Sequence, residues 1–225
     1  MAKKVTRKEL LREEDEFTTF SARAIQFFKE HRHQLNYVII GVAAVALIYV
    51  AFNFFMGRTN KEGQDAYNHA FYSLTQSMAS GATEAPIQAE EQFQRVLDDF
   101  GLSKVSNLAR PQLARLKFLK GEYDEAISLF QEFSKDASDK PLYQSLARLG
   151  LAACYEAKGE YAKSIEVLTQ VTNNPGKTFR EQAMLDLARV YRLSDQEEKS
   201  KEILSAFVEE YQNSPFLPFA KAFLN

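Results

Sequence analysis

The sequence predicts an all-α protein in which one N-terminal transmembrane helix precedes an α-α superhelical solenoid of about 3–4 helical hairpins. Three observations support this prediction. Helix breakers are scarce, with 9 Gly and 6 Pro in 225 residues. Residues 34–57 carry no charge. Downstream, small and large apolar residues recur together at a fixed period, which is typical of stacked helical pairs.

Residues 1–34 form a predicted amphipathic tail. They hold eight Lys and Arg against six acids. Thr6 and Glu9 match a helix capping box, and Phe17, Phe20 and Phe27 recur at helical spacing, so that they share one face. Two interpretations stay open: the tail lies on the inner leaflet with its apolar face down, or it docks onto a partner protein.

Residues 35–56 are the predicted transmembrane helix and the site of contact with the lipid bilayer. As a helix, the apolar core from Tyr37 to Met56 would be about 30 Å long, which matches the hydrocarbon thickness of a membrane. A buried core helix rarely shows apolar residues on every face over such a length. A cleaved signal peptide is the other alternative, but the preceding segment is too long and too acidic for one. Because Lys and Arg concentrate before the span, the positive-inside rule places the tail in the cytoplasm and residues 57–225 across the membrane.

Residues 57–225 contain four copies of a two-helix pattern. In the second helix of each copy a small residue is followed, four positions later, by a large apolar one. The small positions lie 37, 38 and 36 residues apart. The small residue lets two helices approach closely, and the large one fills the gap toward the next hairpin. The small positions are Ala89, Ala126, Ser164 and Ser200, and the large ones are Phe93, Phe130, Leu168 and Leu204.

The turns inside the hairpins carry a second signal. Gly121 and Gly159 end the first helices of the second and third copies, where a left-handed cap favours glycine. Tyr123 and Tyr161 follow two residues later and are expected to pack over the turn. In the fourth copy Asp195 replaces the glycine.

This turn, followed by a small and then a bulky residue, resembles the tetratricopeptide repeat (TPR) family over roughly residues 60–215. With one anchor before the repeats and a Tyr-Gln-Asn-Ser-Pro-Phe ending at 211–216, the whole chain is similar to bacterial TPR proteins of the ancillary SecYEG translocon subunit and cell-division-coordinator type. This resemblance implies a single-pass protein of the bacterial inner membrane with a periplasmic C-terminal domain. It also implies partners among translocon, chaperone or envelope-complex subunits.

The first helices of successive TPR hairpins line a concave groove, so polar residues on those helices are candidates for partner binding. Arginine forks there suit carboxylates and peptide backbones. For any one of these residues, a solvated helix face is the simpler interpretation. The expected binding residues are Gln112, Arg115, Glu156, Asp186, Arg189 and Arg192.

The final segment, residues 214–225, is expected to begin one more helix. Its three phenylalanines, at 216, 219 and 223, would cap the last hairpin. They would otherwise contact a second copy of the chain and form a homo-oligomer.

Catalysis is not expected. The formal net charge of −2 gives no basic signature for nucleic acid. No glycine-rich phosphate loop, G-x-S-x-G or H-E-x-x-H motif is present. His31 and His33 lie on different helix faces, and Cys154 occupies a packing position. The sequence therefore predicts no catalytic residues, cofactor or metal. It favours a protein-binding adaptor, with a structural or assembly subunit of a membrane complex as the alternative.

Overall fold

The computed structural model describes residues 22–23, 25–80, 85–137, 139–174 and 179–224. The side chains of residues 77–80 and 85–87 are not among those described. The capping box at Thr6 and Glu9, and the aromatic positions Phe17 and Phe20, fall outside these ranges. Every regular element within them is an α-helix, which confirms the predicted fold class. The chain divides into two compact units, Met1–Met56 and Gly57–Asn225.

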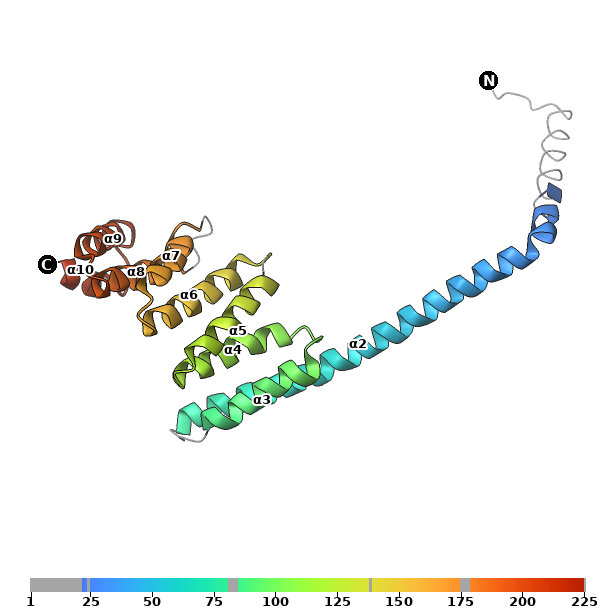
Figure 1. The fold of residues 1–225 in the computed structure, drawn as a ribbon, viewed down its shortest axis with the longest axis horizontal. Coiled ribbons are helices and arrows are strands. Elements are labelled where there is room, and N and C mark those ends of the chain that lie inside the picture. Colours follow the sequence, from blue (N-terminus) through green and yellow to red (C-terminus); the bar gives the residue numbers. More distant parts are fainter. Residues whose placement is uncertain (1–21, 24, 81–84, 138, 175–178, 225) are drawn as a thin grey trace, which may run out of the picture. The chain divides into compact units, whose positions relative to one another are not determined.

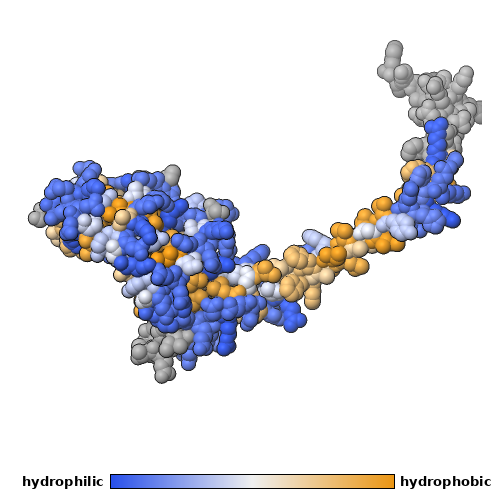
Figure 2. Space-filling model, viewed as in Figure 1, coloured by the Kyte–Doolittle hydropathy of each residue, from blue (hydrophilic) through white to orange (hydrophobic). Residues whose placement is uncertain are grey.

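The first element, α2, runs over Arg32–Ser80. None of its most apolar window is buried inside the structure, and Figure 2 shows apolar surface along this part of the helix. The amide of Asn53 donates to the Tyr49 carbonyl at 2.8 Å, which satisfies one polar group within the apolar stretch. By length and composition α2 is able to cross a membrane.

The same helix also supplies the first helix of the first hairpin. The C-terminal part of α2 pairs with α3 (Ala85–Phe100), and the two lie side by side in Figure 1. Ala70 of α2 shares a core with Phe93 of α3, and the Tyr67 ring meets the edge of Phe93 at 5.8 Å between centroids. Gly57, isolated in a helical pattern, does not end the helix.

Three further hairpins follow, each packed against its neighbour, and together they build the solenoid seen in Figure 1. The second hairpin is α4 (Ser106–Leu119) with α5 (Tyr123–Asp136), the third is α6 (Pro141–Ala157) with α7 (Tyr161–Thr172), and the fourth is α8 (Arg180–Leu193) with α9 (Glu197–Glu210).

The small and large repeat positions all lie in the core. Both repeat serines also use their hydroxyls: Ser164 Oγ donates to the Ala152 carbonyl at 2.9 Å, and Ser200 Oγ donates to the Ala188 carbonyl at 2.7 Å. Serine therefore replaces alanine there without leaving a buried polar group unpaired. The buried repeat residues are Ala89, Phe93, Ala126, Phe130, Ser164, Leu168, Ser200 and Leu204.

The turns of the second, third and fourth hairpins share one backbone conformation. Gly121 and Gly159 have φ of 81° and 74°, and Asp195 has φ of 59°. Each is followed by a residue whose N–H bonds back to the fifth residue before it, as with Gln196 and the Tyr191 carbonyl at 2.8 Å. Aspartate tolerates the left-handed region better than most residues, so the fourth hairpin keeps the turn without glycine.

The last helix, α10 (Leu217–Leu224), packs on α9, as the expected extra helix should. The capping residues differ from those expected, however. Ala220 is fully buried in a core with Phe207, because a small side chain lets α10 approach closely. The three phenylalanines at 216, 219 and 223 remain 46, 51 and 41 % exposed. Phe219 and Phe223 face α8 and α9 across a small hollow, so the phenylalanines cover the last hairpin only in part.

Candidate peptide-binding groove

An apolar groove of about 480 Å³ lies between the first helices of the second and third hairpins, α4 and α6, with α5 beneath it. Two of the expected binding residues, Gln112 and Arg115, lie in it. The remaining lining residues are largely apolar, as in most small-ligand and peptide sites. The groove is lined by Pro111, Gln112, Arg115, Phe118, Leu119, Phe130, Leu146, Leu149, Gly150 and Ala153.

The floor of the groove is the Phe130 ring seated on the backbone of α6. A Cβ added at Gly150 would lie 2.4 Å from Phe130 Cζ, so only glycine allows this contact. Sequence reasoning identified Phe130 as a bulky repeat residue but missed Gly150. The available signal was a glycine in the middle of a helix, where alanine would be more stable by roughly 0.5–1 kcal/mol.

The walls expose large apolar side chains. Leu119 at the end of α4 is 64 % exposed, and Leu146 on α6 is 40 % exposed. Exposed apolar residues gathered around a hollow mark interaction surfaces more often than singly scattered ones do. Neither leucine was singled out from the sequence, because each is an ordinary helix residue until the two helices are placed side by side.

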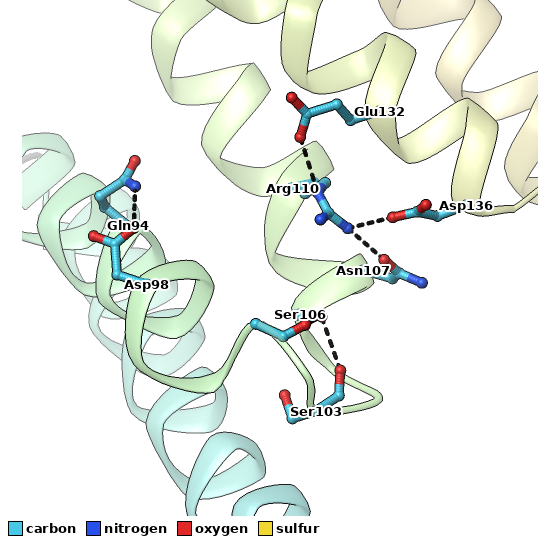
Figure 3. Close-up of polar contacts among 9 residues, drawn as sticks. Gln94, Asp98, Ser103, Ser106, Asn107, Arg110, Glu132 and Asp136 are labelled. Atoms are coloured by element: carbon cyan, nitrogen blue, oxygen red, sulfur yellow. Dashed lines mark hydrogen bonds and ion pairs between the residues drawn. The ribbon is translucent and has the colours of Figure 1, made fainter.

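Arg115 is the charged group of the groove. Its side chain is exposed, and within the described part of the chain it has no hydrogen-bond or ion-pair partner. Arg110, on the same helix, is held in place, as Figure 3 shows. Its guanidinium lies 2.6 Å from Asp136 and 3.3 Å from Glu132. Arg115 is therefore available to a ligand, whereas Arg110 is committed to packing α4 on α5.

Gln112 faces the first hairpin. Burial raises the pKa of the Tyr67 hydroxyl of α2, and Gln112 lies close enough to that hydroxyl to offset part of this rise. Gln112 therefore marks the end of the groove nearest that hairpin.

Three of the other expected binding residues neutralise one another. The Arg189 guanidinium on α8 forms ion pairs with Glu156 on α6 and, at 2.8 Å, with Asp186 on α8. Arg192 lies elsewhere, stacked over the Phe223 ring of α10 at 4.2 Å. The structure thus divides the six expected residues among the groove, an ion-pair bridge between α6 and α8, and the C-terminal helix.

Neither a metal-binding cluster nor an activated thiol is found among the described residues. Among the described residues, no cluster of three or more His, Cys, Asp or Glu is arranged to hold a metal ion. Cys154 is buried, and burial raises the pKa of its thiol to about 11. It is therefore protonated at neutral pH and a poor nucleophile.

Comparison with solved structures supports the fold alone. The TPR-like repeats of a putative kinesin light chain from Podospora anserina match with a TM-score of 0.56 at 17 % identity, covering 72 % of this chain and 82 % of that chain. A singly substituted form of that protein matches with a TM-score of 0.55 at 18 % identity and the same coverage. Comparison with curated protein sequences finds no match.

Comparison with protein families is more specific. The tetratricopeptide repeat-like domain matches residues 26–184, which is more than half of the chain. A tetratricopeptide repeat matches residues 182–214, over the fourth hairpin. Both matches agree with the stacked hairpins and their left-handed turns. The chain therefore belongs to the tetratricopeptide repeat-like domain family.

Proposed function

We propose that this protein is a membrane-anchored adaptor, without catalytic activity of its own, that binds other polypeptides in the groove between α4 and α6. The observation that carries the proposal is the coincidence of exposed Leu119 and Leu146 with an unpaired Arg115 around one hollow. Family membership supports it, because TPR domains are protein-interaction scaffolds as a rule.

The proposed setting is the bacterial inner membrane. Residues 35–56 of α2 span the bilayer, residues 1–34 lie in the cytoplasm, and the domain over 57–225 lies in the periplasm. The support is the apolar, exposed surface of α2 and the excess of Lys and Arg before it. The likeness to ancillary SecYEG translocon subunits makes translocon, chaperone or envelope-complex subunits the proposed partners.

The groove is tested by photo-crosslinking in the full-length, membrane-anchored protein. A photoreactive residue replaces Leu146 in the groove, and a matched one replaces Glu166, which is exposed on the second helix of the same hairpin. Discrete adducts are expected from position 146 and not from position 166. Equal labelling at the two positions, or no adduct at 146, would contradict binding in the groove. Mass spectrometry of the adduct identifies the partner.

The orientation is tested separately. In spheroplasts, added protease is expected to degrade the domain over 57–225 and to spare the tail. A domain that stays intact until the membrane is broken would reverse the proposed topology.

A structural or assembly subunit is the second candidate. The three exposed phenylalanines of α10 favour it, because they offer an apolar face for a permanent neighbour or for a second copy of the chain. A complex of fixed stoichiometry that is lost when Phe216, Phe219 and Phe223 become serine, yet survives Leu146→Glu, would support this candidate over the adaptor.

A further inference from the structure

We infer that the groove selects polypeptide segments in which a large apolar side chain stands beside an Asp or Glu side chain. This inference rests on the proposed function, since it names the class of partner that the same groove takes. It follows from two properties of the lining, its apolar floor and walls and its single unpaired charge.

The apolar half of the requirement comes from the floor and walls. The Phe130 ring fills the bottom against Gly150, and Leu119 and Leu146 lie beside it, 64 and 40 % exposed. The volume of about 480 Å³ lies within the range of about 300–1,000 Å³ that is typical of small-molecule sites, so the groove has room for a large side chain. A large apolar side chain that enters the groove removes both surfaces from water, which stabilises the complex.

The acidic half comes from Arg115. No carboxylate is among the residues that line the groove. Arg115 and Leu119 are four residues apart on α4, so they lie on the same helix face one turn apart. A partner whose apolar side chain contacts Leu119 therefore meets the Arg115 guanidinium close by. Charge complementarity then favours an acid over a base at that place.

Two other cations, one on α4 and one on α8, do not share this property. The ammonium of Lys117, also on α4, lies 2.6 Å from Glu122 and 2.7 Å from Glu125. Farther along the repeats, Arg189 already has two carboxylates, Glu156 and Asp186. A carboxylate of the partner would have to displace those, whereas at Arg115 it would displace none of the described carboxylates.

The test uses the full-length protein in lipid nanodiscs and a displayed library of short random peptides. Peptides enriched by the unaltered protein are expected to pair a large apolar residue with Asp or Glu within one helical turn. Replacing that acid by its amide in one enriched peptide should weaken binding about five-fold, as measured by fluorescence anisotropy. The difference should shrink at high salt, because the pair is exposed.

The matched variants are Arg115→Glu in the groove and Arg95→Glu, an equal charge change at an exposed position of α3. Arg115→Glu is expected to move the enriched sequences from acidic to basic, and Arg95→Glu to leave them acidic. Enrichment without an acidic preference overturns the inference, as does enrichment that Arg115→Glu leaves unchanged or no enrichment at all. If crosslinks from position 146 persist in that case, the proposed groove stands and only its selectivity is wrong.

Discussion

Left-handed backbone positions show how single residues hold the second, third and fourth hairpins. Gly121, Gly159 and Asp195 occupy the same place in three successive turns, all with positive φ. A residue with a Cβ is destabilised by about 1–2 kcal/mol in this region, and Asp by less, because its short side chain bonds locally. The fourth turn is therefore expected to be more strained than the other two.

Two opposite substitutions test this strain. Gly159→Ala should lower the free energy of unfolding by about 1 kcal/mol, and Asp195→Gly should raise it by a few tenths to 1 kcal/mol. Chemical denaturation followed by helical circular dichroism measures both. A loss of stability on Asp195→Gly would mean that the aspartate side chain contributes more than its backbone strain costs.

The contact between Gly150 and Phe130 is the second residue-scale feature. Gly150→Ala should force the ring out of its place and cost about 1–3 kcal/mol, as overpacking does. In a Phe130→Leu background the added methyl meets a shorter side chain, so the same change should cost much less. The free energies of unfolding of the unaltered protein, the two single variants and the double variant form a double-mutant cycle. Equal costs in both backgrounds would show that the two residues are not coupled.

Sequence reasoning reached some of these residues and not others for a physical reason. The positions of Ala126 and Phe130 follow from the repeat period, which is a local property of the chain. The fit of Phe130 on Gly150, and the pairing of Arg189 with Glu156, depend on the angle between hairpins, which no periodicity reports. Arg189→Glu would therefore disturb the stack of hairpins, because three carboxylates would then meet between α6 and α8.

At the scale of elements, a cluster of ion pairs joins α3, α4 and α5. The Lys117 ammonium of α4 lies 3.0 Å from Glu90 of α3 and 2.6 Å from Glu122, which precedes α5. Burial alone would raise the pKa of Glu90, but hydrogen bonds from Lys120 and Lys117 hold it below its ordinary value. Hydrogen bonds from Lys117 and Lys120 lower the pKa of Glu122 as well.

These lowered pKa values predict a pH dependence of unfolding. A carboxyl whose pKa is lower in the folded state stabilises the fold at pH values above its ordinary pKa of 4.5. This contribution is lost as the pH falls from 4.5 through the lowered pKa. Lys117→Met should cost about 1–3 kcal/mol at neutral pH, because Glu90 loses a partner. It should also flatten the loss of stability at acidic pH. Denaturation midpoints of both proteins are measured across this pH range. If the stability of the variant falls with pH as steeply as that of the unaltered protein, the ion-pair cluster does not contribute to the pH dependence.

The sequence predicts the presence of the helices more completely than it predicts where each helix begins and ends. Apolar period, turn glycines and scarce breakers predict hairpins that the structure confirms. The extension of α2 to Ser80 was not predicted, because the change from an uncharged to a charged composition at Gly57 suggests a boundary. Composition changes there, but nothing in the sequence stops the helix, since a single glycine is tolerated inside one.

At the scale of the whole molecule, some described cations of the repeats already pair with carboxylates of the chain, and Arg115 does not. Lys117 and Arg189 each bind carboxylates of neighbouring helices and so stabilise the stack. Arg115 binds none of the described side chains and lies in the apolar groove. The sequence predicts a protein-binding scaffold as a class. Locating the candidate groove requires knowing which cations already pair with carboxylates of the chain, and only the structure shows this.

The proposed membrane anchor can be tested on the protein as a whole. Val45→Asp combined with Ile48→Asp places two charges in the exposed apolar part of α2. Each costs about 2.5–3.5 kcal/mol at the centre of a bilayer, so the doubly substituted chain should move from the membrane pellet to the soluble fraction after high-speed centrifugation. Its helical circular dichroism should stay close to that of the unaltered protein, because neither residue contributes to the solenoid core.

Val45→Leu combined with Ile48→Leu is the matched control and should stay in the pellet. Crosslinks from position 146 to a membrane partner should fall in the aspartate variant alone, because tethering supplies the high effective concentration at which the groove meets that partner. If the unaltered protein itself stays in solution after lysis without detergent, α2 is not a membrane anchor. Binding in the groove would then take place without the high effective concentration that tethering supplies.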